Sequence, residues 1–269
     1  MKLQVVGVAK SFKADGGPLE VLRDVSLTVP TGGFVSLIGP SGCGKSTLFN
    51  LLAGLEAPDG GRLVLDGRPV RDCRGAVAYM QQKDLLLPWR RNVDNAILGP
   101  ELRGVPRRAA RDEASALFQR FGLAGFERAY PAQVSGGMRQ RVALIRTLLF
   151  ARDLLLLDEP FGALDAMTRV IMQGLLLDAW REFGKTILFI THDIEEAVLL
   201  SDTIYVLTAR PGTIKAEVPV PLPRPRLATD PAVVTLKGTL LDLVQAEAAA
   251  AFAAEQPSAA VGRVMSYEL

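Results

Sequence analysis

Short apolar runs alternate along the chain with segments in which apolar residues recur every three or four positions. The first kind, typical of strands, occurs at 3–9, 25–29, 34–38, 62–66, 76–80, 154–158, 187–190 and 203–207. Helical periodicity follows Gly44, Ala163 and Asp193. Several runs are apolar throughout, as in strands buried on both faces. The alternation predicts an α/β fold with a mostly parallel sheet.

The middle of the chain, 90–150, has helical patterns only. Residues 107–121 form a charged amphipathic segment, and 134–146 contain a second helical segment that starts after Gly137. The apolar stripe of the first segment consists of Ala110, Ala114, Leu117, Phe118 and Phe121. We therefore expect a helical subdomain over about 90–150, inserted in an α/β domain that spans 1–216.

A change of composition after Ala216 predicts a separate C-terminal part, 217–269. Residues 218–226, VPVPLPRPR, are too rich in proline for a helix or central strand and predict an extended linker. Asp230 as N-cap and Pro231 at the first helical position predict a helix after it, followed by a poorly ordered tail. This part is a packing helix with a tail or, alternatively, a regulatory or dimer-contact element.

Composition excludes several classes of protein. The 269 residues carry a formal net charge of only +2, without a basic block, which argues against nucleic acid as a partner. Cys43 and Cys73 are the two cysteines, too few for a disulfide framework, so we expect a reducing, cytosolic setting. The first residues contain no apolar core of signal-peptide length, and no apolar run approaches the ~20 residues that span a bilayer. Work at a membrane would therefore need a partner.

The segment GPSGCGKST predicts a phosphate-binding loop, because it fits G-x-x-x-x-G-K-[ST] between a strand and a helix. Its glycines let successive backbone N–H groups surround phosphates, and the helix N-terminus adds its dipole. Lys45 would add a positive charge near the β- and γ-phosphates, and the Ser46 hydroxyl would bind Mg²⁺. The expected nucleotide-binding residues are Gly39, Pro40, Ser41, Gly42, Cys43, Gly44, Lys45, Ser46 and Thr47.

Two acidic residues at the end of the apolar run LLLLDE predict hydrolysis of the bound nucleotide. Asp158 suits the magnesium shell, and Glu159 is placed to act as general base toward water. His192, the only histidine, follows another apolar run, and the carboxyl ends of parallel strands share one edge of a sheet. We therefore expect His192 near the γ-phosphate, where it would bind phosphate or orient Glu159.

Ser135, Gly136 and Gly137 precede the helical segment of the middle region and predict a second anion site. No acid, base or metal ligand stands beside them in the sequence. An anion bound there would need chemistry supplied from elsewhere.

Together these motifs resemble the ATP-binding cassette (ABC) family over about residues 1–215. The phosphate-binding loop, Gln82, the Ser135 turn, Asp158-Glu159, the ALD segment at 163–165 and His192 follow the order and spacing of that family. The resemblance implies a P-loop (RecA-like) core with an antiparallel β edge, ATP and Mg²⁺ as cofactors, and a head-to-tail dimer of cassettes.

The resemblance also assigns roles by position. It implies that Ser135, Gly136 and Gly137 bind the ATP held by the second subunit, and that Asp165 lies at the dimer interface. Gln82, with Gln81 as the alternative, would contact Mg²⁺ and water, and Phe12 would stack on adenine, unless it is an ordinary core residue. The family's usual L-S-G-G-Q is V-S-G-G-M here, so Met138 lacks the polar contact of the glutamine.

Three further segments look like the nitrate, taurine and aliphatic-sulfonate class of importer ATPases: 81–99, SGGMRQRVAL and PLPRPR. That class implies an integral membrane permease, a solute-binding protein outside the membrane, and a peripheral position on the cytoplasmic face. Residues 86–89 would receive a helix of the permease, with Trp89 either an anchor or a core residue. The alternative is a non-transport ABC ATPase of repair or assembly. A kinase or GTPase lacks support, since no N-K-x-D motif is present.

Overall fold

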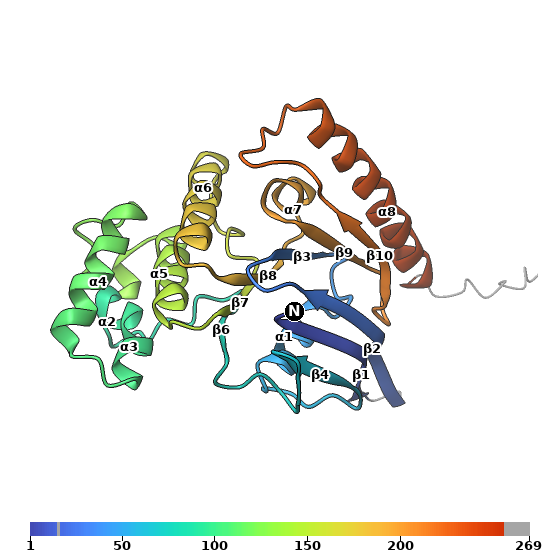
Figure 1. Ribbon diagram of the computed structural model, residues 1–269, viewed down its shortest axis with the longest axis horizontal. Coiled ribbons are helices and arrows are strands. Elements are labelled where there is room, and N and C mark those ends of the chain that lie inside the picture. The colour runs from blue at the N-terminus through green and yellow to red at the C-terminus, as the bar shows by residue number, and fades with distance from the viewer. Residues whose placement is uncertain (15–16, 256–269) are drawn as a thin grey trace, which may run out of the picture.

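The computed structural model describes residues 1–14 and 17–255, which form two sheets and their covering helices (Figure 1). One sheet has six strands in the order β10-β9-β3-β8-β7-β6. Its bounds are β3 (Phe34–Ile38), β6 (Val77–Met80), β7 (Leu154–Asp158), β8 (Thr186–Ile190), β9 (Thr203–Leu207) and β10 (Ile214–Pro219). All neighbouring pairs are parallel except β9 and β10. The predicted α/β class is confirmed.

The second sheet is antiparallel, in the order β2-β1-β4-β5. Its strands are β1 (Leu3–Ala14), β2 (Gly17–Val29), β4 (Gly60–Leu65) and β5 (Arg68–Val70). Between the two sheets lies α1 (Lys45–Leu52), whose Leu48, Phe49 and Leu52 are fully buried. This helix starts directly after the predicted phosphate-binding loop, so the packing of two sheets fixes the position of that loop.

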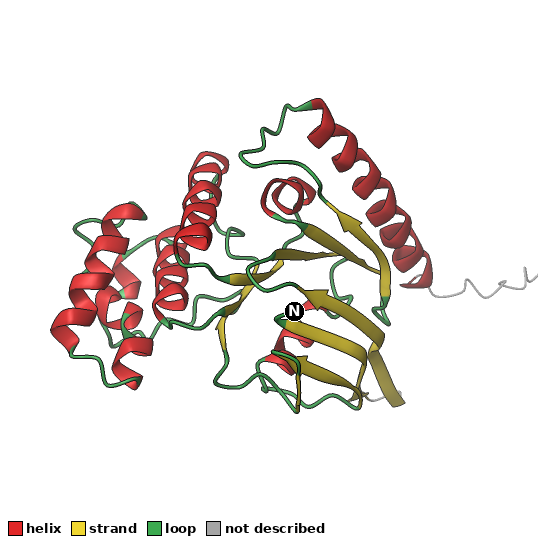
Figure 2. Cartoon of the chain, viewed as in Figure 1, coloured by secondary structure: helices red, strands yellow, loops and turns green. Residues whose placement is uncertain are grey.

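Helices cover the other face of the parallel sheet and extend beyond it (Figure 2). Residues 90–150 contain α2 (Asn92–Ala96), α3 (Leu98–Leu102), α4 (Arg107–Arg120), a short 3₁₀ helix (Pro131–Gln133) and α5 (Gly136–Leu149). The predicted apolar stripe of α4 is buried. Among the described residues, this stretch has no strand, as the sequence pattern indicated. Its treatment as a subdomain stays a prediction.

The remaining helices are α6 (Ala166–Glu182), α7 (Ile194–Leu200) and α8 (Pro231–Glu255). α8 packs along α7 and the β9–β10 edge through Val233 and Leu240. It begins where the sequence predicted, with the Asp230 side chain accepting from the Ala232 N–H. No described helix combines the length and apolar character needed to cross a membrane.

Three parts of the sequence interpretation differ from the structure. β10 was not predicted, and Val218 and Pro219 belong to this edge strand rather than to a linker. Proline is tolerated there because an edge strand leaves one row of N–H groups unpaired. The first half of β2, and all of β5, were not predicted because their sequences are mostly polar or exposed. The predicted tail, the last dozen residues, lies outside the described residues.

Candidate functional site

The phosphate-binding turn lies between β3 and α1, at the carboxyl edge of the parallel sheet. Gly44 is the N-cap of α1 with φ 104°, and a Cβ there would lie 2.6 Å from Leu22 Cδ2. Only glycine fits this position, because the backbone is left-handed and the strand behind it is in contact. The turn therefore presents its amides and the first N–H groups of α1 to the pocket.

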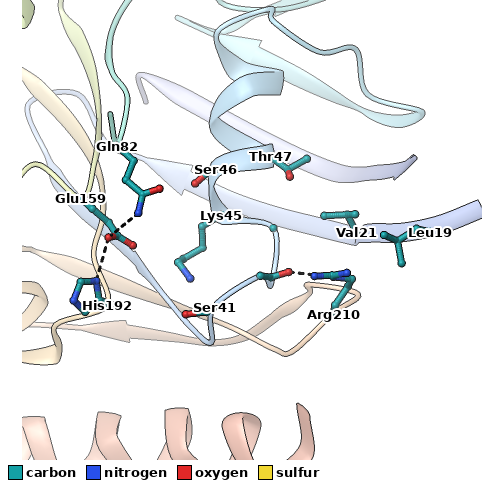
Figure 3. Close-up of a pocket in the computed structure, with 12 residues that line it drawn as sticks. Leu19, Val21, Ser41, Lys45, Ser46, Thr47, Gln82, Glu159, His192 and Arg210 are labelled. Atoms are coloured by element: carbon teal, nitrogen blue, oxygen red, sulfur yellow. Dashed lines mark hydrogen bonds and ion pairs between the residues drawn. The ribbon is translucent and has the colours of Figure 1, made fainter. Parts of the chain in front are cut away.

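Lys45 places a cation inside this turn. Its Nζ donates to the carbonyl oxygens of Gly39 and Pro40, each at 2.9 Å, and the residue is buried. Cys43 Sγ lies 3.6 Å from the same Nζ, and Cys43 is itself buried. Figure 3 shows Lys45 reaching from the start of α1 into the middle of the pocket. A buried ammonium among backbone carbonyls and amides is suited to an anionic ligand.

Asp158 ends β7 beneath this turn and is 2% exposed. Burial raises the pKa of its carboxyl group, while hydrogen bonding to Ser46 and the charge of Lys45 act in the opposite direction. The Tyr79 hydroxyl also donates to Asp158, at 3.5 Å. A carboxylate beside a serine hydroxyl is a set of hard oxygen ligands, which fits Mg²⁺ held jointly with nucleotide phosphates.

Glu159 is held between two side chains from neighbouring strand ends. Its Oε2 accepts from Gln82 Nε2 at 3.2 Å and lies 3.2 Å from His192 Nδ1. The three residues follow β7, β6 and β8, which are adjacent in the sheet. Glu159 has φ 46°, and its N–H donates to the Ile190 carbonyl at 2.9 Å. Such a backbone costs roughly 1 kcal/mol and is typical of functional positions.

These groups line one pocket of about 410 Å³ (Figure 3). Glu159, Gln82 and His192 lie at one end of it, and Leu19, Val21 and Arg210 at the other. The complete lining is Leu19, Val21, Ser41, Gly42, Gly44, Lys45, Ser46, Thr47, Gln82, Glu159, His192 and Arg210.

Some of the residues predicted from the sequence line this pocket, and others lie outside it. Gln82 faces the pocket, whereas Gln81 lines a different groove. Phe12 is half-buried and pairs with Leu19 across the β1–β2 hairpin, next to the pocket but not in its lining. Sequence reasoning missed Leu19, Val21 and Arg210. The alternation in PLEV could have indicated the first two, but nothing local marks Arg210.

The Ser135 turn lies apart from this pocket and belongs to a second exposed surface. Ser135 caps α5, its Oγ accepting from the Met138 N–H at 3.2 Å. A Cβ on Gly137 would lie 2.9 Å from Leu164 Cδ2. The neighbouring Asp165 caps α6 by accepting from the Thr168 N–H at 2.9 Å. The turn and Asp165 thus share one face, and neither lines the pocket of its own chain.

Residues 86–89 precede α2 and form a partly exposed turn. Leu86 is buried, while Trp89 is 72% exposed. The interpretation of Trp89 as a core residue is therefore wrong. A separate groove of about 430 Å³ lies between the sheet and the helical stretch, and its lining includes Leu55, Leu102, Arg103 and Arg152.

Comparison with known proteins agrees with these features. Residues 22–162 match a family described as ABC transporter. An uncharacterized ABC transporter ATP-binding protein of Methanocaldococcus jannaschii is 42% identical over 92% of each chain. An aliphatic sulfonates import ATP-binding protein (SsuB 2) of Pseudomonas aeruginosa is 45% identical over 91% of this chain and 85% of that one. A taurine import ATP-binding protein (TauB) of P. aeruginosa is 41% identical over 90% and 95%.

A solved structure shares the fold. It is the dimeric, post-hydrolysis state of the ATP-binding cassette MJ0796 bound to ADP and Pi. The TM-score is 0.73 at 29% sequence identity, over 81% of this chain and 98% of the other.

Proposed function

The chain belongs to the ABC transporter family of ATP-binding proteins, and from that membership we propose that it is the ATP-hydrolysing, energy-coupling subunit of an importer. The observation that carries this proposal is the position of Glu159 between Gln82 and His192, at one end of the pocket that Lys45 enters. A base held by two partners beside a phosphate cradle is suited to attack by water on a terminal phosphate.

The chemistry divides among the residues as follows. The turn amides and Lys45 hold the phosphates of ATP and offset their charge. Glu159 accepts a proton from the attacking water, and Gln82 and His192 fix the direction in which its carboxylate points. Ser46 and Asp158 would hold Mg²⁺, which when bound neutralises charge on the β- and γ-phosphates.

The proposed working form is a dimer in which each ATP lies between two chains. The Ser135 turn and Asp165 share an exposed face away from their own pocket. A helix N-terminus with a serine and two glycines is suited to an anion brought by a second copy. The Ser135 turn of one chain would thus contact the ATP in the pocket of the other.

The proposed cargo is a small solute of the sulfonate or taurine type, carried through a separate membrane permease. The names of the relatives at 41–45% identity support this class. In this assignment a solute-binding protein outside the membrane delivers the cargo, and the chain sits on the cytoplasmic face. The exposed Trp89 is the proposed anchor for a permease helix, because aromatic side chains dominate such contacts.

The Glu159→Gln variant tests the proposal. Loss of the base should slow hydrolysis at least ~100-fold while ATP binding persists, so the dimer should remain closed on ATP. The tagged variant is purified from detergent-solubilised membranes with ATP and Mg²⁺, and co-purifying proteins are identified. Glu113→Gln, an exposed carboxylate on α4, is the matched control. We expect a hydrophobic multi-span protein with the variant. Normal hydrolysis would refute the role of Glu159, and a dimer without a membrane partner would refute the importer assignment.

The Trp89→Ala variant tests the anchor in the same assay. Removing a 72% exposed side chain should leave folding and ATP binding intact, but reduce recovery of the permease at least severalfold. Val234→Ala, which truncates an exposed apolar residue on α8, is the control. Equal recovery with both variants would contradict the anchor.

A further inference from the structure

Arg210 lies in the loop between β9 and β10 and reaches the phosphate-binding turn. Its Nε donates to the Gly42 carbonyl at 3.2 Å. It lines the pocket at the end formed by Leu19 and Val21, opposite the end formed by Glu159, Gln82 and His192 (Figure 3). A guanidinium has five N–H donors and a permanent charge, so one carbonyl uses only part of its capacity.

The loop that carries Arg210 is fixed to β2 by backbone hydrogen bonds and touches the phosphate-binding turn. The Gly212 N–H donates to the Val21 carbonyl at 2.9 Å, and the Arg23 N–H donates to the Gly212 carbonyl at 3.0 Å. A Cβ on Gly212 would lie 2.2 Å from the Cys43 carbonyl oxygen, so the two backbones touch. Arg210 therefore has a defined place at the pocket, although its side chain is exposed.

We propose that Arg210 is a second cationic contact to the nucleotide, placed at its adenosine end, where it binds the α-phosphate. Among the described residues, the lysine and arginine that line the pocket are Lys45 and Arg210. Lys45 lies in the middle of the pocket, and Arg210 lies at the end formed by Leu19 and Val21. A triphosphate chain held by the turn, with its terminal phosphate toward Glu159, has its α-phosphate toward Leu19 and Val21. The apolar pair then faces the nucleoside, and Arg210 faces the phosphate nearest to it. The proposal rests on ATP binding and is independent of transport.

Glu247 of α8 is the positioning residue for this contact. Its Oε2 accepts from the Ala209 N–H at 3.0 Å, and its Oε1 accepts from Lys215 Nζ at 2.6 Å. The bond to Lys215 lowers the pKa of Glu247, which indicates that the pair stabilises the charged carboxylate. One side chain thus ties the residue before Arg210 to the strand after it. Through these two bonds, α8 holds the loop that carries Arg210 at the pocket.

Equilibrium binding of ATP and ADP to the purified full chain tests the role of Arg210. Arg210→Ala should weaken both nucleotides about tenfold and to a similar extent, because the α-phosphate is common to them. The effect should shrink at high salt, because the side chain is exposed and screening acts at ~3 Å in 1 M salt. KM for ATP should rise more than kcat falls, and Arg210→Lys should recover part of the affinity. Unchanged affinity, or loss for ATP alone, would overturn the assignment.

Glu247→Ala should weaken both nucleotides in the same direction but by less. Glu247→Gln should recover most of the loss, since its amide oxygen still accepts from the Ala209 N–H. The variant Asp242→Ala, at an exposed carboxylate on the same helix, is the control. Combined with Arg210→Ala, the Glu247→Ala change should add little further loss, because both act through one contact. Additive losses would refute the positioning role. Nucleotide binding by the wild type would leave the proposed function standing in that case.

Discussion

At the scale of single residues, two adjacent carboxylates have different environments and therefore suit different work. Asp158 is almost fully buried, and burial raises its pKa. Glu159 has a left-handed backbone, and its side chain is exposed enough to meet water while Gln82 and His192 orient it. The strand ends at Asp158, and the left-handed backbone of Glu159 turns the second carboxylate away from the first. A buried ligand and an accessible base can thus stand side by side.

Asp158→Asn should stabilise the ligand-free chain and abolish its response to nucleotide. At neutral pH the buried charge of Asp158 destabilises the wild type by roughly 1 kcal/mol. The variant lacks this charge, so its Tm should be about 2 °C higher. Because the pKa of Asp158 in the folded chain lies above the ordinary value of 3.8, the extra stability of the variant over the wild type is complete at any pH above that folded-state pKa. It should fade as pH drops through that pKa toward 3.8. Thermal unfolding against pH, with and without Mg²⁺ and ATP, measures both effects. A lower Tm at neutral pH would contradict the argument.

At the scale of elements, helix N-termini serve both folding and binding. Ser135 caps α5, Asp193 caps α7 by accepting from the Glu195 N–H, and Gly44 opens α1 without a side-chain cap. A glycine in place of a capping side chain leaves the first amides of α1 to a ligand. The N-termini of α5 and α7 thus use amides in hydrogen bonds to a capping side chain, whereas α1 leaves its first amides open to a ligand.

Ser135→Ala and Ser135→Asp separate the capping role from the proposed contact with the partner's ATP. The alanine variant should lose about 1 kcal/mol of unfolding free energy, because the Met138 N–H loses its acceptor. The aspartate variant should keep that stability, since aspartate is an equally good cap. Its charge should nevertheless repel the γ-phosphate and reduce hydrolysis at least ~10-fold. Thermal unfolding and ATPase rates measure the two effects. Normal hydrolysis in the aspartate variant would exclude the contact.

Elements whose residues carry a strong local signal were predicted, and those held by long-range pairing were not. The run at 154–158 became β7 with identical bounds, because a strand buried on both faces is apolar throughout. β5 was missed because Arg68–Val70 is defined only by pairing with β4. Arg210 was missed for the same reason: it meets Gly42 across a large separation along the chain. The place of His192 near Glu159 was expected from the shared edge of parallel strands, and that of Gln82 from the family resemblance. The adjacency of β6, β7 and β8 brings the three together.

At the scale of the whole molecule, two arginines join the C-terminal segment to the core. Arg226 donates to the carbonyl oxygens of Val198, Ser201, Val220 and Leu222. Burial lowers its pKa to about 10, so it remains charged at neutral pH. Arg224 donates to Asp202 and lies over the Trp180 ring, 4.7 Å from its centroid. The proline-rich segment is therefore an attached strap, and α8 is held against α7.

Arg226→Lys should loosen this strap without changing the nucleotide pocket. An ammonium has three donors and no planar fork, so it cannot serve all four carbonyl groups. The loss should be about 2 kcal/mol of unfolding free energy. The Tm should fall by about 4 °C, and proteolysis near 220–230 should accelerate. Arg108→Lys on the exposed face of α4 is the control. Equal melting of the two variants would show that the strap carries no stability.

The placement of the Ser135 turn on a face away from its own pocket has a consequence for inheritance. If each catalytic site takes its base from one copy and its Ser135 turn from another, a defective copy damages sites that it shares with healthy ones. A dimer of one Glu159→Gln copy and one wild-type copy would keep one intact site. Two inactive alleles, one defective at Glu159 and the other at Ser135, would complement each other, because their mixed dimer concentrates both defects in one site and leaves the second intact.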